Sequence, residues 1–175
     1  MSLSKHTQVV ANKLRVDDRK VEDVSKIMPK VFLGNYKAAK DQEFFAKNNI
    51  KAVLNCTKEL PNTFSCANSS LEYMRIPIDD SLREVDFNKF YEFLPVITQF
   101  IHKHVDLQKN NILIHCHAGR ARSCGALVGY LMEFRKMTPQ DACELLLKKR
   151  NEAFFYGESV NFEKPLMKYY KKILM

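Results

Sequence analysis

Short apolar runs alternate with helical patterns along most of this 175-residue chain. The runs at 27–34, 51–56, 72–77 and 111–115 predict strands, because they are brief, apolar and bounded by turn-forming residues. Strands that alternate with helices pair in parallel, since a right-handed crossover returns the chain to the same edge. We therefore expect an α/β fold, with a mostly parallel twisted sheet of four to five strands and helices on both faces.

Several segments between and after these strands carry helical spacing. The predicted helices lie at 37–48, about 87–101, 121–134, after Thr138, and at 162–173. Asp86 is the expected N-cap of the second helix. Pro95 should kink or break that helix, because an interior proline removes a backbone hydrogen bond at a cost of ~3 kcal/mol. Thr138 followed by Pro139 is a typical helix start.

The length suits a single domain. Residues 1–23 are polar and rich in charge, so we expect a short helix or arm there, with the main folded domain at 24–175. The composition, 46% hydrophobic and 27% charged, excludes disorder as the main state. No internal repeat is visible.

No apolar stretch approaches the ~18 residues that a membrane helix needs, and the N-terminal residues lack the apolar core of a signal peptide. We therefore expect a protein that does not span a membrane and that acts inside the cell, in the cytoplasm or nucleus. The five cysteines are an odd number without paired spacing, which predicts free thiols.

The formal charge of +8 indicates an anionic partner: nucleic acid, a membrane surface or a phosphorylated substrate. Residues 116–175 contribute +5 of this excess and residues 1–115 contribute +3. The charge therefore gathers in the loop after the last predicted strand and in the helices that follow. No aromatic and basic stripe or known binding motif accompanies it, so we do not expect nucleic acid as the partner.

The predicted strand 111–115 runs into the segment His-Cys-His-Ala-Gly-Arg-Ala-Arg-Ser at 115–123. This combination of residue types has a chance expectation on the order of 10⁻⁵. A loop between a buried strand and a helix N-terminus directs backbone N–H groups inward, and the helix dipole adds positive charge. Gly119 permits a tight turn, and the guanidinium of Arg122 can donate bidentate hydrogen bonds to two phosphate oxygens.

A thiol in a loop of this kind, at a helix N-terminus, is stabilised as a thiolate. Cys116 is therefore the predicted nucleophile. Thiolate attack on a phosphoryl group needs a proton donor for the departing oxygen and later a base for water. Asp79 and Asp80 follow a neighbouring predicted strand and are the candidates. Ser123 can donate a hydrogen bond to the sulfur, and His115 can support the loop.

The segment resembles the signature His-Cys-x5-Arg-Ser/Thr of the cysteine-dependent protein tyrosine phosphatase superfamily, through His115, Cys116, Arg122 and Ser123. Within the superfamily the dual-specificity branch is most similar, because segments 27–35, 50–62 and 73–80 also resemble its elements. The resemblance implies Asp80 as general acid and a two-step hydrolysis without metal or cofactor. It implies a phosphate-binding loop made of His117, Ala118, Gly119, Arg120 and Ala121. The expected substrate is a protein phosphorylated on Tyr, Ser or Thr.

Two departures from that branch leave the substrate open. Ala121 stands where the branch often has Ser, and His117 and Arg120 add basic groups to the loop. Phosphoinositide phosphatases place basic residues similarly, so a phosphoinositide or other polyanionic lipid is the alternative substrate. A phosphate-binding scaffold without catalytic activity is a further alternative.

Other residues carry weaker expectations. Cys56, at the end of the neighbouring strand, could form a protective disulfide with Cys116 under peroxide, whereas Cys124 and Cys143 are expected in the core. The histidines near Cys116 lack ligand spacing, so no metal site is expected. Lys164, Lys168, Lys171 and Lys172 form either a solvated helix face or a docking surface for an acidic partner. We expect a monomer.

Overall fold

The computed structural model describes residues 22–64, 70–81, 83–154 and 162–175. Nearly all of the arm predicted at 1–23 lies outside these residues, as does Cys66.

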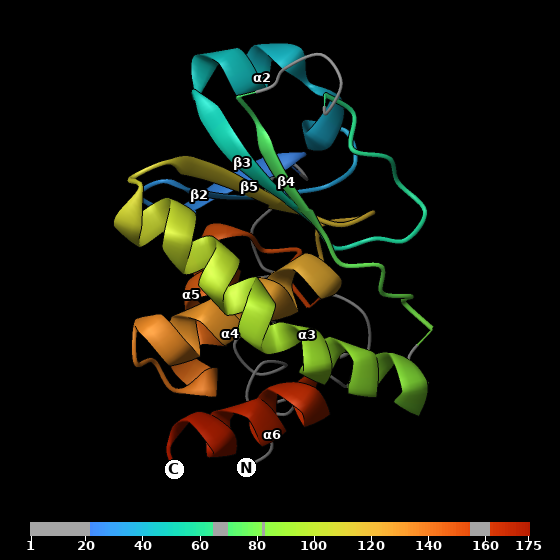
Figure 1. Ribbon diagram of the computed structural model, residues 1–175, viewed down its shortest axis with the longest axis vertical. Helices are drawn as coiled ribbons and strands as arrows, with labels where there is room; N and C mark the ends of the chain where they lie inside the picture. Colours follow the sequence, from blue (N-terminus) through green and yellow to red (C-terminus); the bar gives the residue numbers. More distant parts are fainter. Residues whose placement is uncertain (1–21, 65–69, 82, 155–161) are drawn as a thin grey trace.

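A five-stranded sheet forms the centre of the molecule (Figure 1). Its strands are β1 (Val24–Met28), β2 (Val31–Gly34), β3 (Ile50–Asn55), β4 (Glu72–Arg75) and β5 (Asn111–His115). They lie in the order β1-β2-β5-β3-β4, and every pairing is parallel except that of β1 with β2. The predicted mostly parallel sheet of four to five strands is therefore confirmed.

The apolar run 27–34 does not form the single strand that we predicted. It is divided by a turn at Pro29 and Lys30 between antiparallel strands β1 and β2, and Lys30 has a φ of 71°. Positive φ lets the chain reverse within two residues, whereas a continuous strand requires negative φ throughout. Apolar composition alone does not reveal such a turn, and β1 becomes the edge of the sheet.

Helical segments cover both faces of the sheet. They are η1 (Ala38–Lys40), α2 (Gln42–Lys47), α3 (Glu84–His102), η2 (Lys103–Leu107), α4 (Arg122–Phe134), α5 (Pro139–Lys149) and α6 (Glu163–Ile173). In Figure 1, α2 lies above the sheet and α3 to α6 lie below it. The helix predicted at 37–48 is interrupted at Asp41, whose carboxylate caps α2 by accepting a hydrogen bond from Phe44 N (2.9 Å).

The two faces bury separate cores of different size. The larger core lies between the sheet and α3 to α6, and it includes nearly the whole surface of α4, as its apolar sequence predicts. The smaller core, beneath α2, is built on Phe32, Phe44, Phe45 and Val53. Because α4 is buried on nearly all sides, it gives rigid support to the loop that precedes it.

The start of α3 differs from the prediction. The helix begins at Glu84 with Arg83 in the N-cap position, so the assignment of Asp86 as N-cap was wrong. Asp86 lies in the first turn, is buried, and accepts a hydrogen bond from Ser81 Oγ. A carboxylate there still faces the positive end of the helix dipole.

Pro95 does not break α3, which continues from Glu84 to His102. Proline fixes φ near the helical value, so it can remain in a helix that tertiary packing stabilises despite the lost hydrogen bond. Its neighbours Leu94 and Ile97 are completely buried, and this packing maintains the helix. The predicted start of α5 is confirmed, since Thr138 Oγ1 accepts a hydrogen bond from Asp141 N (3.1 Å) and Pro139 is the first helical residue.

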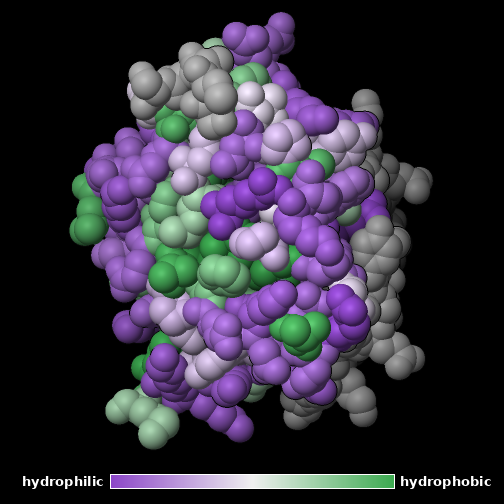
Figure 2. Space-filling view, turned by 45° about the vertical axis from the view of Figure 1, so that its right-hand side comes forward, coloured by the Kyte–Doolittle hydropathy of each residue, from purple (hydrophilic) through white to green (hydrophobic). Residues whose placement is uncertain are grey.

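On the face that Figure 2 shows, hydrophilic residues predominate and hydrophobic ones gather near the middle. Among the described residues, no helix has the length and hydropathy required to cross a bilayer.

Candidate active site

The loop 116–121 leaves the sheet at the carboxyl end of β5. β5 is the central strand, with His115 in register with Gly34 of β2 on one side and with Asn55 of β3 on the other. Ligands of parallel α/β sheets bind at this edge. The loop then enters the N-terminus of α4 at Arg122, as the sequence predicts.

Carbonyl groups of this loop accept hydrogen bonds from outside it. His117 O accepts from Tyr36 N (3.0 Å), and Arg120 O accepts from Phe154 N (2.7 Å). In a trans peptide the C=O and the following N–H point in opposite directions. The outward carbonyls therefore direct the following amides, those of Ala118 and Ala121, toward the interior of the loop.

Gly119 completes the turn. Its φ is +67°, and a Cβ at this position would lie 2.6 Å from Gly34 O, so only glycine fits. Its amide donates to Cys116 Sγ (3.2 Å), while its carbonyl accepts from the side chain of Arg150 (Nε, 2.8 Å).

Cys116 is buried, with 1% of its surface exposed. Its sulfur accepts hydrogen bonds from Gly119 N and from Ser123 Oγ, both at 3.2 Å. These two donors hold the sulfur in place inside the loop. The structure thus brings Cys116, Gly119 and Ser123 together as the sequence predicts.

The guanidinium of Arg122 lies beside the loop and is 4% exposed. Its Nη1 donates to Ile78 O (3.1 Å) and to Glu59 Oε1 (3.3 Å), whereas Nε has no hydrogen-bond partner among the described residues. Burial acts to lower the pKa of Arg122, but the charges of Cys116, Asp80 and Glu59 raise it overall. Arg122 is therefore a permanently charged donor whose Nε makes no hydrogen bond and lies 3.6 Å from Asp80 Oδ2, and such a guanidinium is suited to an oxyanion.

The two acidic candidates are in different environments. Asp80 Oδ2 lies 3.6 Å from Arg122 Nε, which places this carboxylate at the loop. Asp79 instead accepts a hydrogen bond from Lys58 Nζ, which lowers the pKa of Asp79, and its Oδ1 accepts from Asp80 N (2.8 Å). Asp79 therefore stays ionised and paired with Lys58. Because Asp80 lies at the loop, it is the better placed proton donor.

His115 lies behind the loop, with 1% of its surface exposed. Burial lowers the pKa of His115 to about 4, and the charge of Arg122 acts in the same direction. His115 O also accepts a hydrogen bond from Cys56 N (2.8 Å), which joins β5 to the end of β3. His115 is therefore neutral and buried at the end of β5, and its support of the loop stays a prediction.

Three further thiols, of Cys56, Cys124 and Cys143, are buried. Cys56 follows Asn55, whose register partner is His115, so it lies on the strand beside Cys116. Burial raises the pKa of Cys56 well above its usual value, and the Cys116 charge adds to this effect. Cys124 Sγ approaches Gly119 O at 3.6 Å, and burial raises the pKa of Cys124 as well. Cys124 and Cys143 are fully buried, which confirms that both belong to the core.

In the parts of the chain that the structure describes, no group of three or more His, Cys, Asp and Glu side chains could hold a metal ion. His102 is the last residue of α3 and His104 lies in η2, which precedes the other end of β5. His102 Nδ1 is 2.7 Å from Asp106 Oδ2, and its ring stacks on Phe134.

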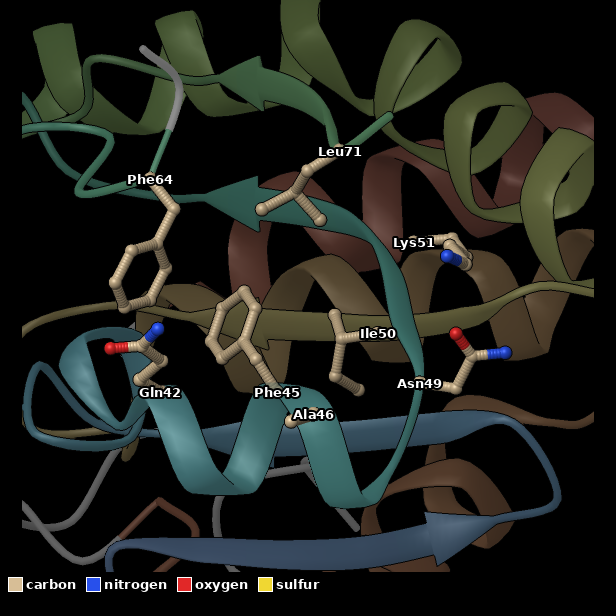
Figure 3. A pocket seen from close by; sticks show the side chains of 8 residues that line it. All are labelled: Gln42, Phe45, Ala46, Asn49, Ile50, Lys51, Phe64 and Leu71. Carbon is tan, nitrogen blue, oxygen red and sulfur yellow. The ribbon is translucent and has the colours of Figure 1, made fainter. Parts of the chain in front are cut away.

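A separate pocket of about 320 Å³ lies between α2 and the β3–β4 edge (Figure 3). Phe45, Ile50, Phe64 and Leu71 form its apolar lining, and none of its lining residues belongs to the loop 116–121. It is therefore distinct from the candidate active site.

Three groups at the site were not found from the sequence: Glu59, the carbonyl of Ile78 and Arg150. Each contacts a loop residue that is distant in sequence, with separations of 63, 44 and 31 residues. No local motif marks them, because their positions depend on how the strands and helices pack.

Comparison with known proteins agrees with this geometry. Residues 31–172 match the family model described as the dual specificity phosphatase catalytic domain. The human dual specificity protein phosphatase 9 is 32% identical over 144 residues, which cover 80% of this chain and 36% of that protein. The human dual specificity protein phosphatase 21 is 31% identical over 127 residues, covering 73% of this chain and 63% of that protein.

Solved structures share the fold. Human DUSP28 superimposes with a TM-score of 0.76 and 21% identity, covering 91% of this chain and all of that one. The structure of PTPMT1 in complex with PI(5)P has a TM-score of 0.69 and 21% identity, covering 87% and 97%.

The chain belongs to the dual-specificity phosphatase family. It spans about a third of the length of the first of the curated relatives above and less than two thirds of the second.

Proposed function

We propose that this chain hydrolyses phosphomonoesters of proteins, on Tyr and on Ser or Thr, through a cysteinyl-phosphate intermediate. The observation that carries the proposal is the buried Cys116 sulfur, which accepts two hydrogen bonds beside the guanidinium of Arg122. Family membership supports the same activity.

In the first step the Cys116 thiolate attacks phosphorus, and the bond from phosphorus to the substrate oxygen breaks. Loop amides and Arg122 bind the phosphoryl oxygens, over which the negative charge is spread in the transition state. Asp80 gives its proton to the departing oxygen, which leaves as a hydroxyl group.

In the second step Asp80 accepts a proton from water as the water attacks the cysteinyl phosphate. The sulfur–phosphorus bond breaks and inorganic phosphate forms. Ser123 Oγ, 3.2 Å from the sulfur, donates a hydrogen bond that stabilises the departing thiolate. The residues supply the nucleophile, the acid and the base themselves, so the proposal includes no metal or cofactor.

The test is turnover of p-nitrophenyl phosphate by the wild type and by the Cys116→Ser and Asp80→Asn variants, each with and without a chelator. We expect Cys116→Ser to abolish turnover and the chelator to have no effect. Activity that survives Cys116→Ser, or that disappears with the chelator, would contradict the mechanism.

A phosphoinositide or other polyanionic lipid is the second candidate substrate. His117 is exposed and Arg120 is partly exposed in the loop, where further phosphate groups of a lipid would meet them. A structural neighbour, PTPMT1, was solved with PI(5)P. Phosphate release from a phosphopeptide panel, measured beside release from phosphoinositide vesicles, distinguishes the two classes.

A catalytically silent scaffold is the third candidate. It would bind phosphopeptides without releasing phosphate, so the same panel, measured by binding and by phosphate release together, separates it from an enzyme. The presence of Cys116, Arg122 and Asp80 at one site favours the enzyme.

Lys164, Lys168, Lys171 and Lys172 are all exposed on α6. We propose this row as a docking surface for an acidic segment of a protein substrate. Charge reversal at Lys171 and Lys172 should weaken turnover of a protein substrate and leave p-nitrophenyl phosphate turnover unchanged. Equal effects on both substrates would argue against docking.

A further inference from the structure

We propose that Arg150 is a positioning residue, which orients the phosphate-binding loop through the carbonyl of Gly119. The inference rests on the proposed function, since it assigns the residue that holds one of the loop's peptides in its binding orientation. Arg150 follows the last turn of α5 and is 2% exposed, although it is an arginine. Such burial of a charged side chain requires compensating partners.

Those partners come from two segments that are distant in the chain. Arg150 Nε donates to Gly119 O (2.8 Å) in the loop. Nη1 donates to Glu22 O (3.0 Å) and to Ser25 Oγ (3.1 Å), at the start of β1. The guanidinium therefore joins the end of α5, the edge strand β1 and the loop 116–121.

Glu152 neutralises the buried charge. Its Oε2 lies 3.5 Å from Arg150 Nε, and its Oε1 accepts a hydrogen bond from Glu22 N (3.2 Å). Glu152 is only 5% exposed, so the pair is fixed within the protein and is only weakly screened by solvent. A guanidinium held at so many points has one position, which suits it to orient a neighbouring peptide.

The peptide that Arg150 holds is the one between Gly119 and Arg120. Because its carbonyl is turned outward toward Arg150, its N–H, which belongs to Arg120, is directed to the interior of the loop. Cys124 Sγ also approaches this carbonyl, at the longer distance of 3.6 Å, and is a weak donor. Arg150 is therefore the main side-chain donor that fixes the orientation of the Gly119–Arg120 peptide.

The other outward loop carbonyls, of His117 and Arg120, accept from the backbone amides of Tyr36 and Phe154. Side-chain substitution cannot remove those donors. Of these three hydrogen bonds to loop carbonyls, the one to Gly119 O is therefore the one that a substitution of the donor side chain can test.

The experiment compares wild type with Arg150→Met and Arg150→Lys, using p-nitrophenyl phosphate. In Arg150→Met the Gly119–Arg120 peptide can rotate and one oxyanion donor is lost, so kcat should fall and KM should rise together. We expect kcat/KM to decrease about 100-fold. Arg150→Lys should recover part of the loss, because an ammonium group can still donate to Gly119 O but cannot also contact β1. Arg135→Met, which removes an ion pair with Asp106, is the control for lost stability.

A second measurement does not depend on turnover. Inorganic phosphate should protect Cys116 from alkylation by iodoacetamide, followed by mass spectrometry. The phosphate concentration that gives half protection should rise about tenfold in Arg150→Met and should stay at the wild-type value in Arg135→Met.

The outcomes separate the two proposals. A wild type without turnover would refute the proposed function, while the protection assay would still test Arg150. Wild-type KM and wild-type phosphate protection in Arg150→Met would overturn the positioning role. A fall in kcat alone would also overturn it, because a smaller folded fraction lowers kcat and leaves KM and phosphate binding unchanged.

Discussion

Glu59 Oε1 lies 3.3 Å from Arg122 Nη1, so a carboxylate contacts the arginine that is expected to bind phosphate. Glu59 comes from the segment after β3 and is 41% exposed in its side chain. It shares Nη1 with the carbonyl of Ile78, while Nε lies 3.6 Å from the carboxylate of Asp80. A phosphate dianion at Arg122 would thus be bound beside a second negative charge.

Replacing Glu59 with Gln should therefore strengthen binding of oxyanions. The repulsion across a partly exposed site is screened by water, so we expect roughly 1 kcal/mol or less, equivalent to about a two- to fivefold decrease in KM and in the inhibition constant of vanadate. Steady-state kinetics at constant ionic strength measures both. Glu43→Gln, an exposed substitution on α2, is the charge-matched control. An increase in both constants for Glu59→Gln would show that Glu59 mainly orients Arg122.

Asp80→Asn should slow hydrolysis in a manner that depends on the leaving group. The proton that Asp80 supplies matters most for an alkoxide, so a phosphothreonine peptide should lose about 100-fold in kcat. p-Nitrophenyl phosphate, whose leaving group is far more acidic, should lose less. Asp79→Asn is the matched control, because Lys58 holds Asp79 ionised. Equal losses for both substrates, or a larger loss in Asp79→Asn, would remove Asp80 as the acid.

His115 should make the protein less stable as the pH falls. Its folded-state pKa of about 4 lies below the ordinary 6.5, so the unfolded chain binds the proton more tightly. The contribution of His115 is complete above pH 6.5 and is lost as the pH falls toward 4, by about 3 kcal/mol. Urea unfolding of wild type and His115→Gln at pH 7 and pH 4.5 tests this. The variant should show a weaker pH dependence, whereas His117→Gln, an exposed change, should behave as the wild type does.

Peroxide should convert Cys116 and Cys56 to a disulfide. Peroxide oxidises the Cys116 thiolate to a sulfenic acid, and the Cys56 thiol then displaces water to form the S–S bond. The two residues lie on adjacent strands, and Cys56 N bonds to His115 O. Mass spectrometry should find the Cys56–Cys116 crosslink, and Cys56→Ala should recover less activity after thiol reduction. Cys124→Ala is the control, and a Cys116–Cys124 crosslink in its place would transfer the role to Cys124.

The fold class followed from the sequence because its signals are local. The apolar run of β5 and the apolar surface of α4 predicted a buried strand and a central helix, and both were found with nearly the predicted limits. The turn within 27–34 and the continuity of α3 through Pro95 were not predicted, because tertiary packing and backbone conformation decided them.

The sequence by itself determined the loop chemistry. Residues 115–123 are contiguous, so the thiol, the glycine turn, the arginine and the hydroxyl had to lie together wherever the chain folded. Only the tertiary structure decided what surrounds them: Glu59 on the guanidinium of Arg122, and Arg150 on the carbonyl of Gly119. The physical reason is distance along the chain, because contacts across 31 to 63 residues arise from strand order and helix packing, which no local pattern records.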